Sequence, residues 1–144
     1  MENRIRQLTP DDYDDIIRVW ADAGLPYRPD GRDSREHINS EMERSDTAFY
    51  GLFEDDRMVA VGVMTYDGRK GWINRVAVDP DCRGRGLAVE IVEAGERFLR
   101  GLGAQVIACL IEGQNLPSMA LFGKMGYSYH EDILYFSKRD SSNV

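Results

Sequence analysis

A turn that contains two arginines and two glycines is the feature of this sequence with the clearest chemical meaning. Residues 76–88 read VAVDPDCRGRGLA, in which an apolar run ends in Asp-Pro and a helical apolar pattern begins after the turn, at Leu87. Free backbone N–H groups at the start of a helix carry partial positive charge and bind anions, and glycine lets a phosphate approach the backbone closely. The pattern therefore predicts an anion site, most naturally for phosphate, at Arg83, Gly84, Arg85 and Gly86.

Two common nucleotide-binding motifs do not fit this turn. A P-loop requires Lys-Ser or Lys-Thr after its last glycine, and Leu87-Ala88 stand there instead. The dinucleotide fingerprint requires a third glycine at the position of Val89. From the motif alone, the remaining alternative to an anion site is a surface turn that binds no ligand.

The elements that would position the turn alternate between strands and helices. The patterns predict strands at 5–8, 48–56, 58–67, 71–79 and 105–111 and, near the end of the chain, in YSYHE (127–131) and ILYFSK (133–138). They predict helices at 10–23, 34–44, 87–102 and 115–125. The expected class is α/β (α+β), with a mixed, mostly antiparallel sheet of about seven strands and helices on both faces.

Composition limits the kinds of partner. The chain has 144 residues, of which 42% are hydrophobic, and a formal net charge of −7. We expect a single domain over 1–144, with a frayed polar tail at 139–144, and neither nucleic acid nor a membrane as partner. The absence of a signal-like apolar run predicts a cytoplasmic location. Cys82 and Cys109 have no metal-ligand spacing, so we expect free thiols and no metal.

Two separated motifs resemble those of the GCN5-related N-acetyltransferases (GNAT). Arg83-x-x-Gly86-x-Ala88 after VAVDP resembles the family's Arg/Gln-x-x-Gly-x-Gly/Ala motif. About 30 residues later, NLPSMALFGKMGY resembles its Asn…Ala-Leu-Tyr-x-Lys-x-Gly-Phe/Tyr segment, and the opening IRQLTPDDYDDIIRVW resembles its first strand and helix. The resemblance covers nearly the whole chain and implies the GNAT fold, in which the sheet splays between the fourth and fifth strands.

The resemblance also implies acetyl-CoA as the cosubstrate. The backbone of the strand that ends at Val78 would bind the pantetheine arm as an added strand, and the amides of the turn would hold the pyrophosphate. Asn115 would lie beside the pantetheine and Phe122 near the sulfur. The implied cofactor-binding residues are Val76, Ala77, Val78, Arg83, Gly84, Arg85, Gly86, Leu87, Ala88, Asn115 and Phe122.

The catalytic groups are less evident. In many family members a tyrosine protonates the departing thiolate, and this chain has Phe122 at that position. The proton would then come from solvent, Tyr127 or Tyr129. For both tyrosines, packing is the favoured role. Glu112 is the first candidate for the base; its alternative role is that of a solvated acid at a strand end. Asn74 is a candidate to orient the amine or a water molecule; alternatively, it is a surface residue on a half-exposed strand.

Acceptor recognition is expected from the loop between the first two helices. Its charges alternate in sign and suit a zwitterion or a peptide end, although part of the loop is expected to be merely solvated. The residues concerned are Tyr27, Arg28, Asp30, Arg32 and Asp33.

These features together predict an N-acetyltransferase that acts on a primary amine, of a small molecule or of a peptide or protein, by direct attack in a ternary complex. The alternative is a non-catalytic acyl-CoA-binding or regulatory module of the same fold, and a weaker one is an interaction domain that has lost the cofactor. Dimers are frequent in the family, so a homodimer is left open.

Overall fold

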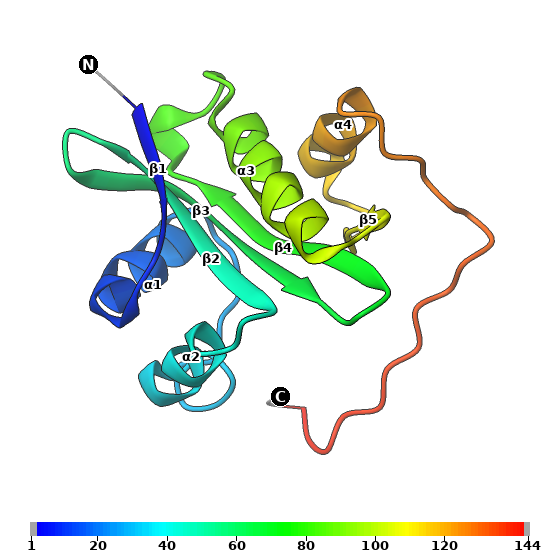
Figure 1. Ribbon diagram of the computed structural model, residues 1–144, viewed down its shortest axis with the longest axis horizontal. Coiled ribbons are helices and arrows are strands. Elements are labelled where there is room, and N and C mark those ends of the chain that lie inside the picture. Colours follow the sequence, from blue (N-terminus) through cyan, green and yellow to red (C-terminus); the bar gives the residue numbers. More distant parts are fainter. Residues whose placement is uncertain (1–2, 143–144) are drawn as a thin grey trace.

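The computed structural model describes residues 3–142 as a five-stranded sheet between two layers of helices (Figure 1). The strands are β1 (Asn3–Gln7), β2 (Thr47–Glu54), β3 (Arg57–Tyr66), β4 (Lys70–Val78) and β5 (Val106–Ala108). The helices are α1 (Tyr13–Asp22), α2 (Arg35–Met42), α3 (Leu87–Leu102) and α4 (Leu116–Lys124), with single 3-10 turns η1 (Pro10–Asp12) and η2 (Pro80–Cys82). The strands lie in chain order; β4 and β5 pair in parallel, and the other pairs are antiparallel.

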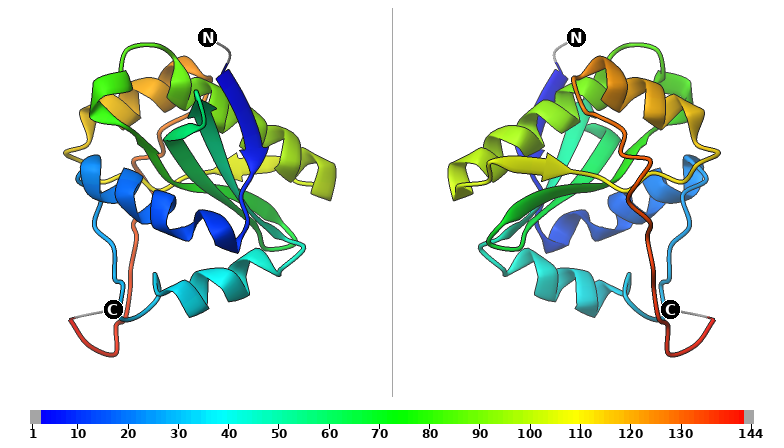
Figure 2. Two further views of the ribbon diagram at one scale, coloured as in Figure 1. Left: turned by 90° about the vertical axis from the view of Figure 1, so that its left-hand side faces the viewer. Right: turned by 90° about the vertical axis from the view of Figure 1, so that its right-hand side faces the viewer.

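The helices α1 and α2 cover one face of the sheet (Figure 2). Proline in the first turn after Thr9 starts η1, which leads directly into α1. Apolar residues at helical spacing form one face of α1, and this face packs on the sheet. Ile16, Val19 and Trp20 are almost completely buried there. This face of the sheet will be called the α1/α2 face.

The helix α3 packs closely on the opposite face. Leu87, Ile91 and Leu99 are buried there against β3 and β4. A methyl group added to Gly95 would lie only 2.5 Å from the terminal carbon of Met64 and 2.7 Å from its Cγ, so either Met64 or the helix would have to shift. The absence of a side chain at Gly95 thus allows α3 to lie close to β3.

The prediction of about seven strands is wrong for this structure, which has five among residues 3–142. The segments 127–131 and 133–138 contain no strand, and the chain after Tyr127 runs in an extended course along the outside of the molecule (Figure 1). The residues there have high β propensity, but a strand also needs a hydrogen-bonding neighbour, and no strand of the described part lies beside this segment. Of the predicted frayed tail, residues 143–144 lie outside the described part.

The predicted strand at 105–111 is shorter than expected. It forms a strand only over Val106–Ala108, where it pairs with Lys70–Trp72 of β4. Beyond Trp72 the two strands separate, so the residues that follow Ala108 lose their hydrogen-bonding partner and continue without regular structure. The sheet is therefore open between β4 and β5.

Candidate active site

The separation of β4 from β5 leaves one edge of β4 without a strand partner. On its other edge β4 continues to pair with β3 as far as Val78, which faces Ala60. Among residues 3–142, no strand pairs with the β5-side edge of β4 beyond Trp72. Asp79 donates its amide to Val59 of β3, so by the alternation of a strand Ala77 also faces β3. Val76 and Val78 therefore present their backbone groups to the opening, as an extended ligand would require.

This free edge leads directly to the glycine turn. Gly84 and Gly86 have φ angles of +80° and +77°, a left-handed conformation that favours glycine. Gly86 is the N-cap of α3, and no side chain caps that helix end. The amides of its first turn, from Leu87 to Val89, have no acceptor within the helix, so they can bind an anion.

A cavity of ≈ 390 Å³ lies beside the turn, between the beginning of α3 and α4. Arg83 and Lys124 lend it positive charge from opposite sides, and Pro117 and Leu121 of α4 add an apolar wall. Besides these four, its lining comprises Val78, Cys82, Gly84, Gly86, Leu87, Ala88, Val89 and Ala120. A cationic and partly apolar hollow that faces free amides suits a phosphorylated ligand with an apolar arm.

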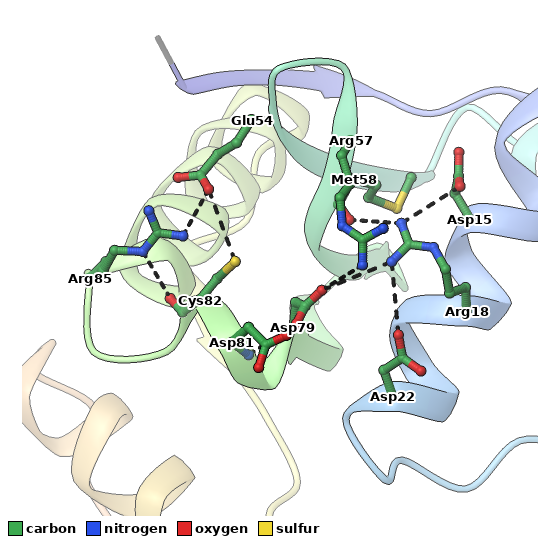
Figure 3. A network of polar contacts seen from close by, with 10 residues as sticks. All are labelled: Asp15, Arg18, Asp22, Glu54, Arg57, Met58, Asp79, Asp81, Cys82 and Arg85. Carbon is green, nitrogen blue, oxygen red and sulfur yellow. Dashed lines mark hydrogen bonds and ion pairs between the residues drawn. The ribbon is translucent and has the colours of Figure 1, made fainter. Parts of the chain in front are cut away.

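A buried carboxylate anchors the chain at the base of the turn. Asp79, only 4% exposed, accepts a hydrogen bond from the amide of Asp81 at 3.0 Å. Figure 3 shows Arg57 of β3 and Arg18 of α1 converging on the same carboxylate, at 3.1 Å and 4.0 Å. The Asp81 amide, with these two guanidinium groups, holds the pKa of Asp79 below its usual range. Contacts from η2, β3 and α1 thereby hold the chain in place where it leaves β4 and enters the turn.

The two arginines of the turn have different surroundings. Arg85 donates to Glu54 of β2 at 2.8 Å, on the side of the turn away from α4 (Figure 3). Arg83 is exposed and lines the cavity. Of the two, Arg83 is the one placed to contribute charge to a ligand, whereas Arg85 ties the turn to the sheet.

The sequence reasoning missed Arg75, which lies at a bulge of β4 opposite the separation of the strands. Its φ of +53° is unusual for a residue with a side chain, and the register between β3 and β4 shifts at this point. The guanidinium lies 4.1 Å from the centroid of the Trp20 ring, donates to the Pro26 carbonyl at 2.7 Å and lies 3.6 Å from the Asp33 carboxylate. Burial lowers the pKa of Arg75. No sequence signal marks a left-handed arginine inside a strand.

Arg75 connects β4 to the loop that the sequence analysis assigned to the acceptor. In that loop Asp33 is buried and accepts from the amide of Arg28 at 2.7 Å, so it organises the loop rather than facing solvent. Arg28, Asp30 and Arg32 are exposed. The loop and the bulge together form a polar wall on the α1/α2 face, beside the opening in the sheet.

The two candidate catalytic residues lie on different elements and differ in exposure. Asn74 is half-buried on β4, next to the bulge, and pairs with Val63, whose side chain belongs to the core on the α1/α2 face. Glu112 is exposed beyond the end of β5 and accepts from the side chain of Gln114 at 2.7 Å. Asn115 is the N-cap of α4, where its side chain accepts from the amide of Ser118.

The aromatic residues near α4 are engaged in packing. Phe122 is 6% exposed and makes an edge-on contact with Tyr127, with ring centroids 5.0 Å apart. The Tyr127 hydroxyl donates to Glu96 of α3 at 2.6 Å, and burial, with this carboxylate, raises the pKa of Tyr127 well above its usual value. Tyr127 thus has a structural partner, as the packing interpretation predicted.

The thiol of Cys109 lies where the chain leaves β5. Burial raises its pKa to about 11, so very little thiolate is present at neutral pH. Cys109 is therefore not an activated nucleophile. Among residues 3–142, no group of three His, Cys, Asp or Glu side chains is arranged to hold a metal ion.

A larger hollow of ≈ 950 Å³ lies elsewhere, between α2 and the β3–β4 turn. Its polar residues include Glu41 and Asp67. The amides of Lys70 and Arg69, with the indole of Trp72, lower the pKa of Asp67 to about 2. This hollow lacks the free helix amides and the strand edge, so the smaller cavity is the better cofactor site.

Comparison with known proteins decides the family. The model of the acetyltransferase (GNAT) family matches residues 6–127, which include the free edge of β4, the turn and α4. The chain belongs to the GNAT acetyltransferase family. An acetyltransferase of Sodalis glossinidius is 27% identical to it over 135 residues, which are 94% of each chain.

Solved GNAT structures share the fold. The PaiA N-acetyltransferase of Thermoplasma acidophilum, in complex with coenzyme A, superimposes with a TM-score of 0.81 at 18% identity, covering 90% of this chain and 92% of its own. The aminoglycoside enzyme AAC(6')-Iy, in complex with a bisubstrate analogue of CoA and acetylneamine, gives a TM-score of 0.83 at 16% identity, covering 96% and 99%. Glucosamine-6-phosphate N-acetyltransferase of Arabidopsis thaliana gives 0.75 at 19% identity, covering 98% and 100%.

No helix among residues 3–142 has the length and hydrophobicity required to cross a membrane.

Proposed function

We propose that this GNAT protein transfers the acetyl group of acetyl-CoA to a primary amine by direct attack in a ternary complex. One observation carries the proposal: the unpaired edge of β4 runs without interruption into a glycine turn whose helix amides are uncapped. The strand edge suits the amide groups of pantetheine, and the turn suits a diphosphate. Two of the three solved structures described above were determined with CoA or a CoA conjugate, which supports the same ligand class for this fold.

Each implied cofactor residue has a defined task in this proposal. The strand segment Val76–Ala77–Val78 binds the pantetheine arm through the backbone groups of Val76 and Val78, with Ala77 holding the segment on β3, and the amides from Arg83 to Ala88 bind the pyrophosphate. The side chain of Arg83 adds positive charge, and Arg85 holds the turn through Glu54. Asn115 keeps α4 in place as its N-cap, and Phe122 packs behind the sulfur from the core.

In the chemical step, the neutral amine attacks the thioester carbonyl carbon, a C–N bond forms, and the C–S bond breaks to release thiolate. The amine must lose one proton and the thiolate must gain one. Asn74 orients the amine from the α1/α2 face. Glu112 accepts the amine proton through water, because its exposed carboxylate stands at the rim of the opening. Solvent protonates the thiolate, since Tyr127 is bound to Glu96.

The acceptor approaches from the α1/α2 face, where the loop around Asp33 and the Arg75 bulge meet. The formal charge of −7 favours the approach of cationic amines over long distances. Neighbours of the same fold are named for small amines, such as an aminoglycoside and glucosamine 6-phosphate, and we propose a small-molecule or peptide amine here.

Calorimetric titration with acetyl-CoA, followed by mass spectrometry of a panel of amines incubated with protein and acetyl-CoA, tests the proposal. We expect binding and at least one product heavier by one acetyl group. Absence of CoA binding at millimolar concentration would overturn it.

A non-catalytic acyl-CoA-binding module is the second candidate. The buried Phe122 at the usual tyrosine position, and the engaged hydroxyl of Tyr127, favour it. Binding of acetyl-CoA without any acetylated amine in the same panel would support the module and contradict the transferase.

A further inference from the structure

The guanidinium group of Arg75 lacks a full set of partners. Its only hydrogen bond within residues 3–142 runs from Nη2 to the carbonyl of Pro26, at 2.7 Å. Oδ2 of Asp33 lies 3.6 Å from the same nitrogen, which is beyond ordinary hydrogen-bond distance. That oxygen also accepts from the Arg28 amide at 2.7 Å and lies 4.0 Å from Nε of Arg32. Nε of Arg75 is buried without a partner in the described part of the chain, so a further acceptor would stabilise this charge.

Two acids act on Arg75, but both have other partners. Asp33 is shared with Arg32, and the carboxylate of Glu41 on α2 lies 3.4 Å from the imidazole of His37. Burial therefore outweighs their attraction and lowers the pKa of Arg75. The positive charge of this side chain is only partly compensated within the chain.

The exposed part of the same wall is also cationic. Arg28 and Arg32 are exposed in the loop between α1 and α2, where Asp30 is the one exposed acid between them. The side chain of Arg75 keeps 23% of its surface exposed, so a ligand can reach it. Although the whole chain has a net charge of −7, this wall suits an anionic group.

The bulge of β4 brings Arg75 to the same face as Asn74. Neighbours along a regular strand point to opposite faces. Here Ile73 and Val76 both belong to the core under α3, and the two residues between them lie on the α1/α2 face. Arg75 contacts Trp20 on that face, and Asn74 pairs across the sheet with a residue of the same core. A ligand that reaches Asn74 therefore lies beside the Arg75 guanidinium as well.

We propose that the acceptor amine carries an oxyanion group, a carboxylate or a phosphate, which Arg75 and Arg32 bind while Asn74 orients the amine. This inference rests on the proposed acetyl transfer and names its substrate class. The planar fork of an arginine side chain matches both oxyanions. Because the Cα atoms of neighbouring residues are about 3.8 Å apart, only a few bonds separate the amine from the oxyanion, as in an α-amino acid or a small phosphorylated amine.

The chemical step remains the one proposed above. The amine nitrogen bonds to the acetyl carbon, the C–S bond breaks, and the proton that the amine loses passes through Glu112 and solvent to the CoA sulfur. The oxyanion takes no part in these bond changes, because it only fixes the position of the amine. The products are an N-acetylated acid or phosphate and free CoA.

Matched pairs of acceptors test the inference on the full chain. We would compare kcat/KM at saturating acetyl-CoA for L-amino acids and their methyl esters, and for O-phosphoethanolamine and ethanolamine. At least one acceptor should be preferred roughly 10-fold or more over its partner without the oxyanion, as the loss of a hydrogen bond to a charged group predicts. An ester lowers the pKa of its amine and leaves more of it neutral, so an enzyme indifferent to the oxyanion would favour the esters. A preference confined to O-phosphoethanolamine would identify the oxyanion as phosphate.

Variants of the wall locate the effect. Arg75→Gln and Arg32→Gln should each reduce the preference roughly 10-fold. Arg32 is exposed, so its variant should fold even if loss of the contact with Trp20 unfolds Arg75→Gln, and circular dichroism checks this. The matched control Arg97→Gln, an exposed position of α3 on the opposite face of the sheet, should leave the preference unchanged.

Three results would overturn the inference. Acetylation of amines without a preference for the oxyanion would contradict it and leave the acetyl transfer intact. A preference that no folded variant of Arg32 or Arg75 reduces would contradict the role of these arginines. Absence of any acetylated product would overturn the inference together with the proposed function.

Discussion

The left-handed glycine at the start of α3 allows a controlled test of the anion site. We consider Gly86→Ala, with Gly24→Ala as the matched control. Their φ angles are +77° and +76°, and a methyl group added at either position meets nothing within 4 Å. An alanine held in this conformation costs about 1–2 kcal/mol. Both variants should therefore lose similar stability, with the unfolding midpoint falling by about 4 °C per kcal/mol.

Only Gly86→Ala should also weaken CoA binding. A left-handed Gly86 aims the first amides of α3 at the cavity, and rotation of an alanine toward negative φ to relieve strain turns them away. A hydrogen bond to a charged group contributes about 1.5–3 kcal/mol, so losing one should weaken CoA binding roughly 10- to 100-fold. Gly24 lies at the end of α1, and its substitution should leave CoA affinity unchanged.

Isothermal titration with CoA and thermal unfolding on the same samples provide both quantities. The reasoning is refuted if Gly86→Ala binds CoA as tightly as the wild type while its unfolding midpoint drops as far as that of Gly24→Ala. That result would show that the strain exists but that the turn does not hold the ligand.

Three further predictions follow from single contacts. Tyr127→Phe should lower the free energy of unfolding, measured in urea, by about 1–2 kcal/mol, because Glu96 loses its hydrogen-bond donor. The same variant should leave kcat unchanged. A hundredfold fall in kcat would instead identify Tyr127 as the acid that protonates the thiolate. The pKa of Asp79 is lower in the folded than in the unfolded protein, so its carboxylate stabilises the fold above about pH 4. This stabilisation is lost as the pH falls through the pKa that Asp79 has in the folded state. Asp79→Asn should therefore narrow the difference in melting temperature between pH 6 and pH 3, and an unchanged difference would contradict this reasoning. With the pKa of its thiol near 11, Cys109 should react slowly with iodoacetamide at pH 8, and Cys109→Ser should keep kcat/KM within about twofold; loss of activity would point to a covalent route.

The helices could be predicted because their signals are local. Proline after Thr9 and the N-capping Asn115 mark two helix beginnings, and the structure has α1, preceded by η1, and α4 within a few residues of the predicted bounds. The turn at residues 83–86 likewise combines glycines and a helix start in one short stretch. Such features depend on neighbours in the sequence, so one sequence suffices to find them.

What could not be predicted depends on distant partners. The half-burial of Arg75 results from Trp20 and the loop around Asp33, and its left-handed backbone from a register shift against β3. The stretch Ile133–Phe136 has residues that favour a strand, yet it forms none, since no strand among residues 3–142 lies beside it. The ion pair between Arg85 and Glu54 could not be predicted from the sequence either, because the two residues are 31 positions apart.

The central claim is that amides of the glycine turn hold the diphosphate of acetyl-CoA while the free edge of β4 holds its pantetheine. A titration of ¹⁵N-labelled protein with CoA, followed through its backbone amide resonances, tests this most directly. The account predicts that the largest shifts occur at Val76–Val78 and at Gly84–Val89. Shifts confined to the residues of the larger hollow beside α2, with the turn unmoved, would contradict it.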